Sequence, residues 1–352
     1  MSPAAGAGLG LAAGLVLYAA SAWLTGRLRR LAPAWGLMDV PNRRSAHRVA
    51  TPRGGGIAIL GAAAGGLLLG AWAAGDDRLA LAVGLLVLPV AAIAFLDDLI
   101  PLPPATRFLV QAIAAAGVLA VFWPAGGLMV GAWRVVAPWA VAGIGFLWLV
   151  WLANLYNFMD GSDGLAGVQA AAGGGVLAAW FAAAGDPALA GLAAGLAVGA
   201  LAFLPWNWAP ARIFMGDTGS VTIGFLVGVL GILGALRQDL PLDAPALAFS
   251  LFIGDASLTL LRRLLRGETP WRAHRSHCYQ RALRLGYTHA QIAWAAVFLC
   301  LLLAGLATLR LYVPALWWAC WAAAAVILGG AAAWLEWRLR AAGGAAPAAR
   351  GQ

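Results

Sequence analysis

Apolar runs of about 20 residues, long enough for a helix to cross the hydrocarbon core of a bilayer, alternate with short polar segments along the chain. Judged by length and flanking residues, this pattern predicts eleven membrane-spanning helices and no soluble domain. The predicted spans are 4–25, 55–74, 79–96, 106–123, 136–153, 165–184, 188–206, 219–236, 244–261, 290–309 and 312–335.

The composition indicates the same fold class, an all-α polytopic integral membrane protein. Of the 352 residues, 62% are hydrophobic and 11% are charged, and the mean hydropathy is +0.83. Residues 1–340 are expected to form one membrane-embedded domain, followed by a short disordered tail over 341–352. In a soluble protein the net charge of +9 would suggest nucleic acid. In a membrane protein it indicates orientation and phosphate binding, so no nucleic-acid partner is expected.

The arginines indicate how the chain is oriented. All 23 basic residues are arginines, and all but Arg78, Arg134, Arg237 and Arg310 fall on one side of the predicted membrane. Because the side rich in basic residues is normally cytoplasmic, the N-terminus is expected outside and the C-terminus inside. The conspicuous polar motifs also lie on the predicted cytoplasmic side, which argues for one shared site there.

The central motif is the stretch from Asn154 to Gly164, between two apolar runs. Asn154, Asn157, Asp160 and Asp163 recur at every third position, a spacing that keeps the first of them on one helix face. Carboxylates at the edge of a span are costly unless they are paired or functional. A helix cap with a polar turn is the alternative interpretation, but a cap needs only one such residue.

Three further motifs lie on the same side. Asp97-Asp98 is suited to hold a divalent cation or act as a base, and otherwise marks an interfacial stop. Asp217, between two glycines at a predicted helix start, is either an N-cap or a Mg²⁺ ligand beside a diphosphate. Asn207, ten residues before it, is within reach of the same pocket.

The arginine-rich loops carry the remaining candidates. His274-Arg275-Ser276-His277 suits phosphate binding, with a zinc site or a simple basic loop as alternatives. Arg53, followed by three glycines, is suited to cradle a phosphate. Together the motifs indicate Mg²⁺-assisted chemistry between a soluble phosphate compound and a lipid phosphate.

These motifs resemble those of the polyprenyl-phosphate N-acetylhexosamine-1-phosphate transferases. The resemblance rests on Thr-Pro-Arg-Gly-Gly-Gly (51–56), Asp97-Asp98, the stretch 154–166, Asn207 with Ile-Phe-Met-Gly-Asp-Thr-Gly-Ser (213–220), and His-Arg-Ser-His (274–277). It implies an enzyme of the bacterial inner membrane with its active site on the cytoplasmic face. Such an enzyme transfers a sugar 1-phosphate from a UDP-N-acetylhexosamine to undecaprenyl phosphate, releases UMP and requires Mg²⁺, with Mn²⁺ as a substitute.

The resemblance also implies residue roles. Asp217 would bind the metal, with Asn157 and Asn154 in support, and Asp97, Asp98, Asp160 and Asp163 would be catalytic. Asn207, Phe214, Arg53, Arg275, His274 and His277 would bind substrate, with Phe214 against the uracil ring. Direct attack by the lipid phosphate, with Asp97 as base, and a phospho-aspartate intermediate both remain open.

The histidine motif bears on the donor. His274-Arg-Ser-His277 replaces the consecutive histidines of the peptidoglycan enzymes, which favours O-antigen or polysaccharide initiation. The expected donor is UDP-N-acetylglucosamine or a 6-deoxy relative such as UDP-N-acetylfucosamine or UDP-N-acetylquinovosamine. A phospho-N-acetylmuramoyl-pentapeptide transferase is the nearest alternative, and a membrane hydrolase or transporter is the rival of another class. The sequence leaves monomer and homodimer both open.

Overall fold

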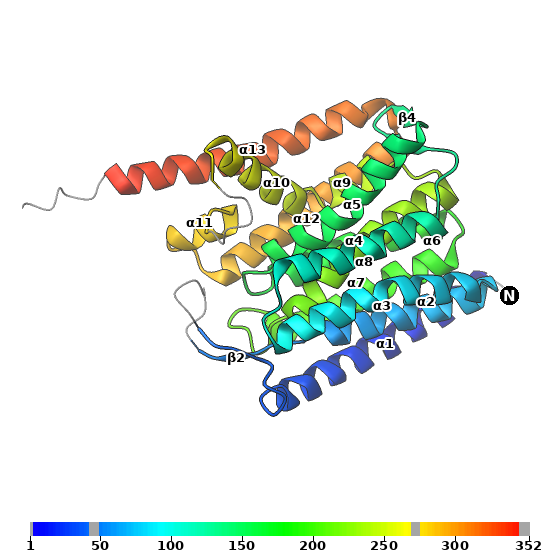
Figure 1. Ribbon diagram of the computed structural model, residues 1–352, viewed down its shortest axis with the longest axis horizontal. Helices are drawn as coiled ribbons and strands as arrows, with labels where there is room; N and C mark the ends of the chain where they lie inside the picture. Colours follow the sequence, from blue (N-terminus) through cyan, green and yellow to red (C-terminus); the bar gives the residue numbers. More distant parts are fainter. Residues whose placement is uncertain (1–2, 42–48, 269–274, 345–352) are drawn as a thin grey trace, which may run out of the picture.

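The computed structural model describes residues 3–41, 49–268 and 275–344, and this part of the chain is almost entirely helical. The helices are α1 (Pro3–Leu31), α2 (Gly56–Ala74), α3 (Asp77–Leu99), α4 (Pro104–Val121), α5 (Pro138–Met159), α6 (Leu165–Ala183), α7 (Pro187–Asn207), α8 (Gly216–Gln238), α9 (Asp243–Ala248), α10 (Ser250–Leu265), α11 (Cys278–Arg284), α12 (His289–Tyr312) and α13 (Trp317–Gly344), with a 3₁₀ turn, η1 (Pro314–Leu316). The all-α polytopic class is confirmed (Figure 1).

Within the described residues, 10 helices are long and apolar enough to cross a membrane. They correspond to the predicted spans except for 244–261, which the structure divides into α9 and α10. The division is stabilised by neighbours: Gln169 of α6 donates to the carbonyl of Ala248, the last residue of α9. The Phe249 ring fills the place where a side chain on Gly173 would stand, 2.2 Å from the position of its missing Cβ.

The two ends of the described chain lie at opposite ends of the helix bundle (Figure 1). A chain that begins at one end and finishes at the other runs through the bundle an odd number of times. The divided segment α9–α10 therefore acts as one further traverse beside the ten long helices. This matches the eleven predicted segments, while the direction of the termini relative to a cell remains a prediction.

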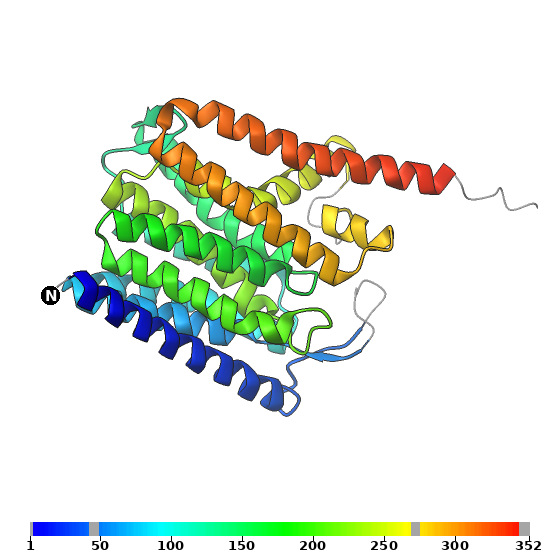
Figure 2. The same ribbon diagram turned by 180° about the vertical axis from the view of Figure 1, so that it is seen from behind.

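Helix α8 lies at the centre of the bundle, and all of its residues from Thr218 to Ala235 are buried. Helices α2, α3, α5, α6 and α7 pack against it. Figure 2 shows α13, α12, α6, α7 and α1 in that order across one face of the bundle. Because α8 runs through the core, a motif at its first turn is held firmly at one end of the bundle.

Two short hairpins close the ends of the bundle. Strand β1 (Met38–Asp39) pairs antiparallel with β2 (Thr51–Pro52), with Asp39 opposite Thr51. At the other end, β3 (Leu128–Val130) pairs with β4 (Trp133–Val135). The first hairpin lies at the end where α11 lies, and it positions Asp39 and Arg53 there (Figure 1).

Helix α13 continues to Gly344, four residues into the segment 341–352 that the sequence predicts to be a tail. Residues 345–352 lie outside the described part of the chain.

Candidate active site

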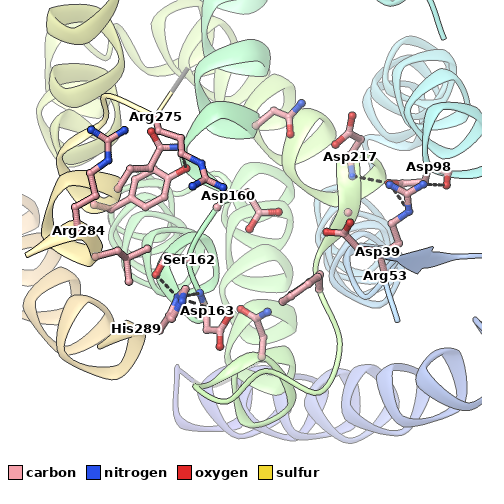
Figure 3. Close-up of a pocket in the computed structure, with 18 residues that line it drawn as sticks. Asp39, Arg53, Asp98, Asp160, Ser162, Asp163, Asp217, Arg275, Arg284 and His289 are labelled. Carbon is pink, nitrogen blue, oxygen red and sulfur yellow. Dashed lines mark hydrogen bonds and ion pairs between the residues drawn. The ribbon is translucent and has the colours of Figure 1, made fainter. Parts of the chain in front are cut away.

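A pocket of about 580 Å³ opens at the end of the bundle that carries β1, β2 and α11. It brings together predicted site residues from five separate segments of the chain. The predicted residues that line it are Arg53, Asp98, Asn157, Asp160, Asp163, Asn207, Phe214, Asp217 and Arg275. Figure 3 shows the charged groups around this pocket. The motifs that sequence analysis places on one side of the membrane therefore share one cavity.

The two adjacent carboxylates of α3 have different roles in the structure. Asp98 is fully buried, and its carboxylate accepts from the backbone N–H groups of Asp217 (3.0 Å) and Thr218 (2.9 Å). The Thr218 hydroxyl donates to the same carboxylate at 2.6 Å. An anion at the first turn of a helix satisfies its free N–H groups and complements its dipole. Asp98 thus fixes the start of α8 and places Asp217 at the pocket.

Asp97 points elsewhere, because successive helical residues face different directions. Its carboxylate accepts from the Leu102 backbone N–H at 2.7 Å and from Arg107 at 2.6 Å. The same Arg107 nitrogen lies 3.3 Å from an oxygen of Asp217. Asp97 is therefore absent from the pocket lining, and it acts on the site through Arg107, a residue that sequence analysis did not single out.

Residues 51–56 pair with residues 213–216 through the backbone. Phe214 N–H donates to the Pro52 carbonyl at 2.8 Å, and Gly55 N–H donates to the Phe214 carbonyl at 2.9 Å. Gly216, at the start of α8, has φ +77, a conformation that glycine adopts without strain. A Cβ there would stand 2.8 Å from Asp98 Oδ2, so a larger residue would disturb the contact that holds α8.

Asn207 joins the central motif to the segment before α8. Its side-chain oxygen accepts from Gly164 N–H at 2.9 Å, and its amide donates to the Ile213 carbonyl at 3.0 Å. Asp163 makes a parallel link, accepting from Ala211 N–H at 2.9 Å. Both residues line the pocket, and both also determine the relative position of the two loops.

The centre of the pocket is strongly acidic. Burial, together with the negative charges of Asp217, Asp98 and Asp163, raises the pKa of Asp160 well above its usual value. Asn157 lies beside this group, with its side-chain oxygen accepting from the Ser220 hydroxyl at 3.0 Å. Crowded carboxylates of this kind favour a bound cation, which relieves their repulsion.

The donor set suits Mg²⁺, although the fit depends on a substrate. In the described residues, no three His, Cys, Asp or Glu side chains come together closely enough to hold a metal ion. Mg²⁺ is usually held by one or two carboxylates together with substrate phosphates and water. Asp217 and Asp160 line one pocket and repel each other, so a phosphate-bound Mg²⁺ fits between them chemically.

Besides Asp97, three predicted site residues are absent from the pocket lining or from the described chain. Asn154 donates to Gln111 (2.7 Å) and to the Val150 carbonyl (2.8 Å), away from the cavity. His277 is buried at the start of α11, stacked on Tyr279 and 3.6 Å from Asp255. His274 lies outside the described residues.

The structure adds residues that sequence analysis did not select. Asp39, Ser162, Tyr279, Gln280, Arg284 and His289 also line the pocket. Ser162 lies within the central motif, so position along the chain was a usable signal for it. Asp39 lies outside the noted motifs and comes to the pocket through the pairing of β1 with β2. Arg284 and His289 follow the histidine motif by several residues, and only the return of α11 and α12 to the pocket identifies them.

Comparison with known proteins supports this description. The model for glycosyl transferase family 4 matches residues 80–235. The chain is 30% identical to a probable undecaprenyl-phosphate N-acetylglucosaminyl 1-phosphate transferase of Bacillus subtilis (strain 168), over 76% of this chain and 75% of that protein. It is 30% identical to a decaprenyl-phosphate N-acetylglucosaminephosphotransferase of Mycolicibacterium smegmatis, over 80% of this chain and 76% of that protein.

A more local similarity links it to a phospho-N-acetylmuramoyl-pentapeptide-transferase of Moorella thermoacetica, at 38% identity over 36% of this chain and 41% of that protein. The two relatives matched over most of their length are named as transferases of N-acetylglucosamine phosphate to polyprenyl phosphates. The chain belongs to glycosyl transferase family 4, within the superfamily of polyprenyl-phosphate N-acetylhexosamine-1-phosphate transferases.

Proposed function

We propose that this protein transfers an N-acetylhexosamine 1-phosphate from a UDP-sugar to undecaprenyl phosphate and releases UMP. The main support is the pocket itself, which gathers acidic groups and the cations Arg53, Arg275 and Arg284 at one end of a membrane-spanning bundle. A pocket at the end of a membrane-spanning bundle is accessible both to a soluble nucleotide sugar and to the phosphate of a lipid. It faces the cytoplasm in this proposal, because that side holds most arginines.

The proposed reaction is a phosphoryl transfer. An oxygen of the lipid phosphate attacks the phosphorus that carries the sugar, and the bond from that phosphorus to the bridging oxygen breaks. UMP leaves with the electron pair, and the product is a lipid diphosphate sugar. A lipid phosphate is already largely anionic near neutral pH, so the attack requires little help from a base.

Residues of the chain hold and orient the two substrates. Arg53, Arg275 and Arg284 offer guanidinium groups to phosphate oxygens, and Phe214 offers a ring face to the base. Asp217 and Asp160, with Asn157 beside them, would hold Mg²⁺, with Mn²⁺ as a substitute. When bound, the metal would neutralise charge on the transferring phosphate.

Direct attack is the proposed mechanism, and the contacts of the two α3 carboxylates argue against a phospho-aspartate at Asp97 or Asp98. A phospho-aspartate would need an exposed carboxylate, but Asp98 accepts three hydrogen bonds at the start of α8 and is fully buried. Asp97 is paired with Arg107 outside the pocket lining. A stable phosphorylated enzyme, trapped with donor alone, would contradict this preference.

The proposed donor is UDP-N-acetylglucosamine or a 6-deoxy N-acetylhexosamine, used to initiate O-antigen or another envelope polysaccharide in the bacterial inner membrane. Support comes from the relatives named for N-acetylglucosamine, which are matched over most of their length. A relative named for the pentapeptide substrate is matched over a shorter part.

The test is UMP release by purified full-length protein in detergent, with undecaprenyl phosphate, Mg²⁺ and a panel of UDP-amino sugars. Turnover is expected with one donor, and only when the lipid is present. UMP release without lipid would indicate a hydrolase, and no release with any donor from folded protein would overturn the proposal.

A further inference from the structure

His289 lines the pocket, although no motif in the sequence points to it. It is the first residue of α12, and a capping box between Thr288 and Gln291 fixes the start of that helix. Its ring is largely buried, with 22% of the side chain exposed. The capped start of α12 therefore fixes the position of the ring at the wall of the cavity.

The contacts of His289 define its tautomer. Nδ1 lies 2.9 Å from the Ser162 hydroxyl, and the Asp163 backbone N–H donates to it at 3.3 Å. A nitrogen that accepts from N–H carries a lone pair, so the ring proton is on Nε2. Among the described residues, the hydrogen bonds of His289 all use Nδ1. Nε2–H thus remains a donor for a ligand in the pocket.

The Ser162–Asp163 turn that His289 holds is connected to the other walls of the cavity. Asp163 accepts from Ala211 N–H, and the next residue, Gly164, donates to Asn207. Trp208 follows Asn207 and stacks edge-on against Trp294 of α12, with 5.2 Å between ring centroids. His289 therefore belongs to a hydrogen-bonded and aromatic region that includes the segment leading to Phe214.

His289 lies across the cavity from the start of α8. Figure 3 shows His289, Ser162 and Asp163 on one side of the cavity, with Asp217, Asp98 and Arg53 on the other. The side of Asp217 suits a metal, and the arginines on both sides suit phosphates. The Nε2–H of His289 and the ring of Phe214, which also lines the pocket, suit a planar group rich in carbonyl and hydroxyl oxygens.

We propose that His289 binds the nucleoside half of the donor, holding the Ser162–Asp163 turn through Nδ1 and donating from Nε2–H to a nucleoside oxygen. This role rests on the proposed function, because it assumes a nucleotide in the pocket. His289 is a binding residue here and takes no part in bond making.

Two amide substitutions separate the two functions of the ring. In His289→Asn the amide group lies near the position of Nδ1, so it retains an acceptor for the turn but lacks the distal donor. In His289→Gln the amide reaches the position of Nε2, so it restores a donor but not the contact with Asp163. His289→Ala removes both.

The experiment measures UMP binding by calorimetry, at fixed Mg²⁺, to the full chain in detergent. His289→Asn is expected to weaken UMP binding by about 3- to 10-fold, the typical effect of one lost neutral hydrogen bond. The KM for the UDP-sugar should rise by the same factor, while kcat and the KM for undecaprenyl phosphate stay unchanged. His289→Gln should recover affinity relative to His289→Ala.

Gln291→Ala is the matched control, because it removes the side-chain oxygen that accepts from Thr288 at the start of α12 without removing the imidazole. It is expected to bind UMP as the wild type does. Equal UMP affinity in His289→Asn and wild type would overturn the role of His289, as would a Gln291→Ala variant with the same loss. If the wild type neither binds UMP nor turns over, the proposed function fails, and this inference fails with it.

Discussion

The two ends of the bundle both contain buried charges, but they handle them differently. At the end with β3 and β4, Arg310 is 3% exposed and makes a two-pronged contact with Asp243, at 2.6 and 3.0 Å. Arg310 also donates to the Gly131 carbonyl, and Gly131 N–H donates to Asp243. Every charge in this group has a partner of opposite sign or a hydrogen bond.

At the pocket end, Asp97, Asp98 and Asp217 share two arginines, Arg53 and Arg107, in the ion pairs of the described residues. Asp160 has its pKa raised by burial and by three neighbouring aspartates. Arg107 serves Asp97 and Asp217 together, and Asp98 is compensated mainly by backbone N–H groups. A buried charge is costly when its partner is removed, whereas the repulsion between crowded like charges is relieved when a cation binds. Whether a buried charge has a partner of opposite sign therefore distinguishes the residues that support the fold from those that bind a ligand, and burial alone does not.

The largest effect is expected from Asp217→Asn. Removing this charge should reduce UMP release by about 10²- to 10³-fold, as loss of a principal electrostatic group does. The melting temperature should change little, because Asp98 still holds the start of α8 through backbone N–H groups.

Asp239→Asn is the control for this substitution. It makes the same chemical change at the opposite end of the same helix, where the carboxylate is 63% exposed. Its activity should match the wild type, and comparable losses in both variants would break the distinction between the two ends.

Arg310→Met tests the paired end. It leaves Asp243 buried without its partner, which should cost about 3–5 kcal/mol of stability. Thermal unfolding in detergent should show the loss, while the protein that remains folded keeps its activity. The double variant Arg310→Met/Asp243→Leu should recover part of the stability. A variant of normal stability but no activity would show that this end also serves the reaction.

Gly161→Ala tests how tightly α11 closes the pocket. The added Cβ would stand 2.1 Å from the Tyr279 hydroxyl, which contacts the Phe158 carbonyl and Gln280. Displacing Tyr279 and Gln280 should lower kcat/KM by about 10- to 100-fold. Gly175→Ala, on α6 with open space around the new methyl group, should have no effect on activity. Unchanged activity in Gly161→Ala would mean that α11 does not shape the reacting geometry.

The smallest effect is expected from Asp160→Asn in metal-free buffer. A carboxyl group whose pKa is raised by folding takes up a proton on folding, so stability falls as pH rises from 3.8 toward the raised pKa. Asp160→Asn removes this contribution and should raise the melting temperature near neutral pH by about 2 °C. The pH slope of the wild type should exceed that of the variant. Identical slopes would show that Asp160 carries no such repulsion.

Local chemistry made much of this protein predictable. A span is a property of about 20 consecutive apolar residues, so ten long helices fall close to their predicted positions. The motifs around Asp97, Asn154, Asn207 and Asp217 are short and ordered along the chain, and the comparisons confirm the superfamily that they indicate. Their common placement on one side followed from counting spans.

Only the tertiary structure decided which contacts each of two neighbouring residues makes. Asp97 and Asp98 are adjacent in sequence, but helix geometry directs one toward Arg107 and the other beneath α8. The break at Phe249 depends on the room beside Gly173 and on Gln169, both distant in sequence. His289 joins the pocket because α12 packs back onto α6, and such contacts have no signature in the local sequence. The sequence by itself determined the spans, the family and most of the acidic site; packing between distant segments determined which groups face the ligand.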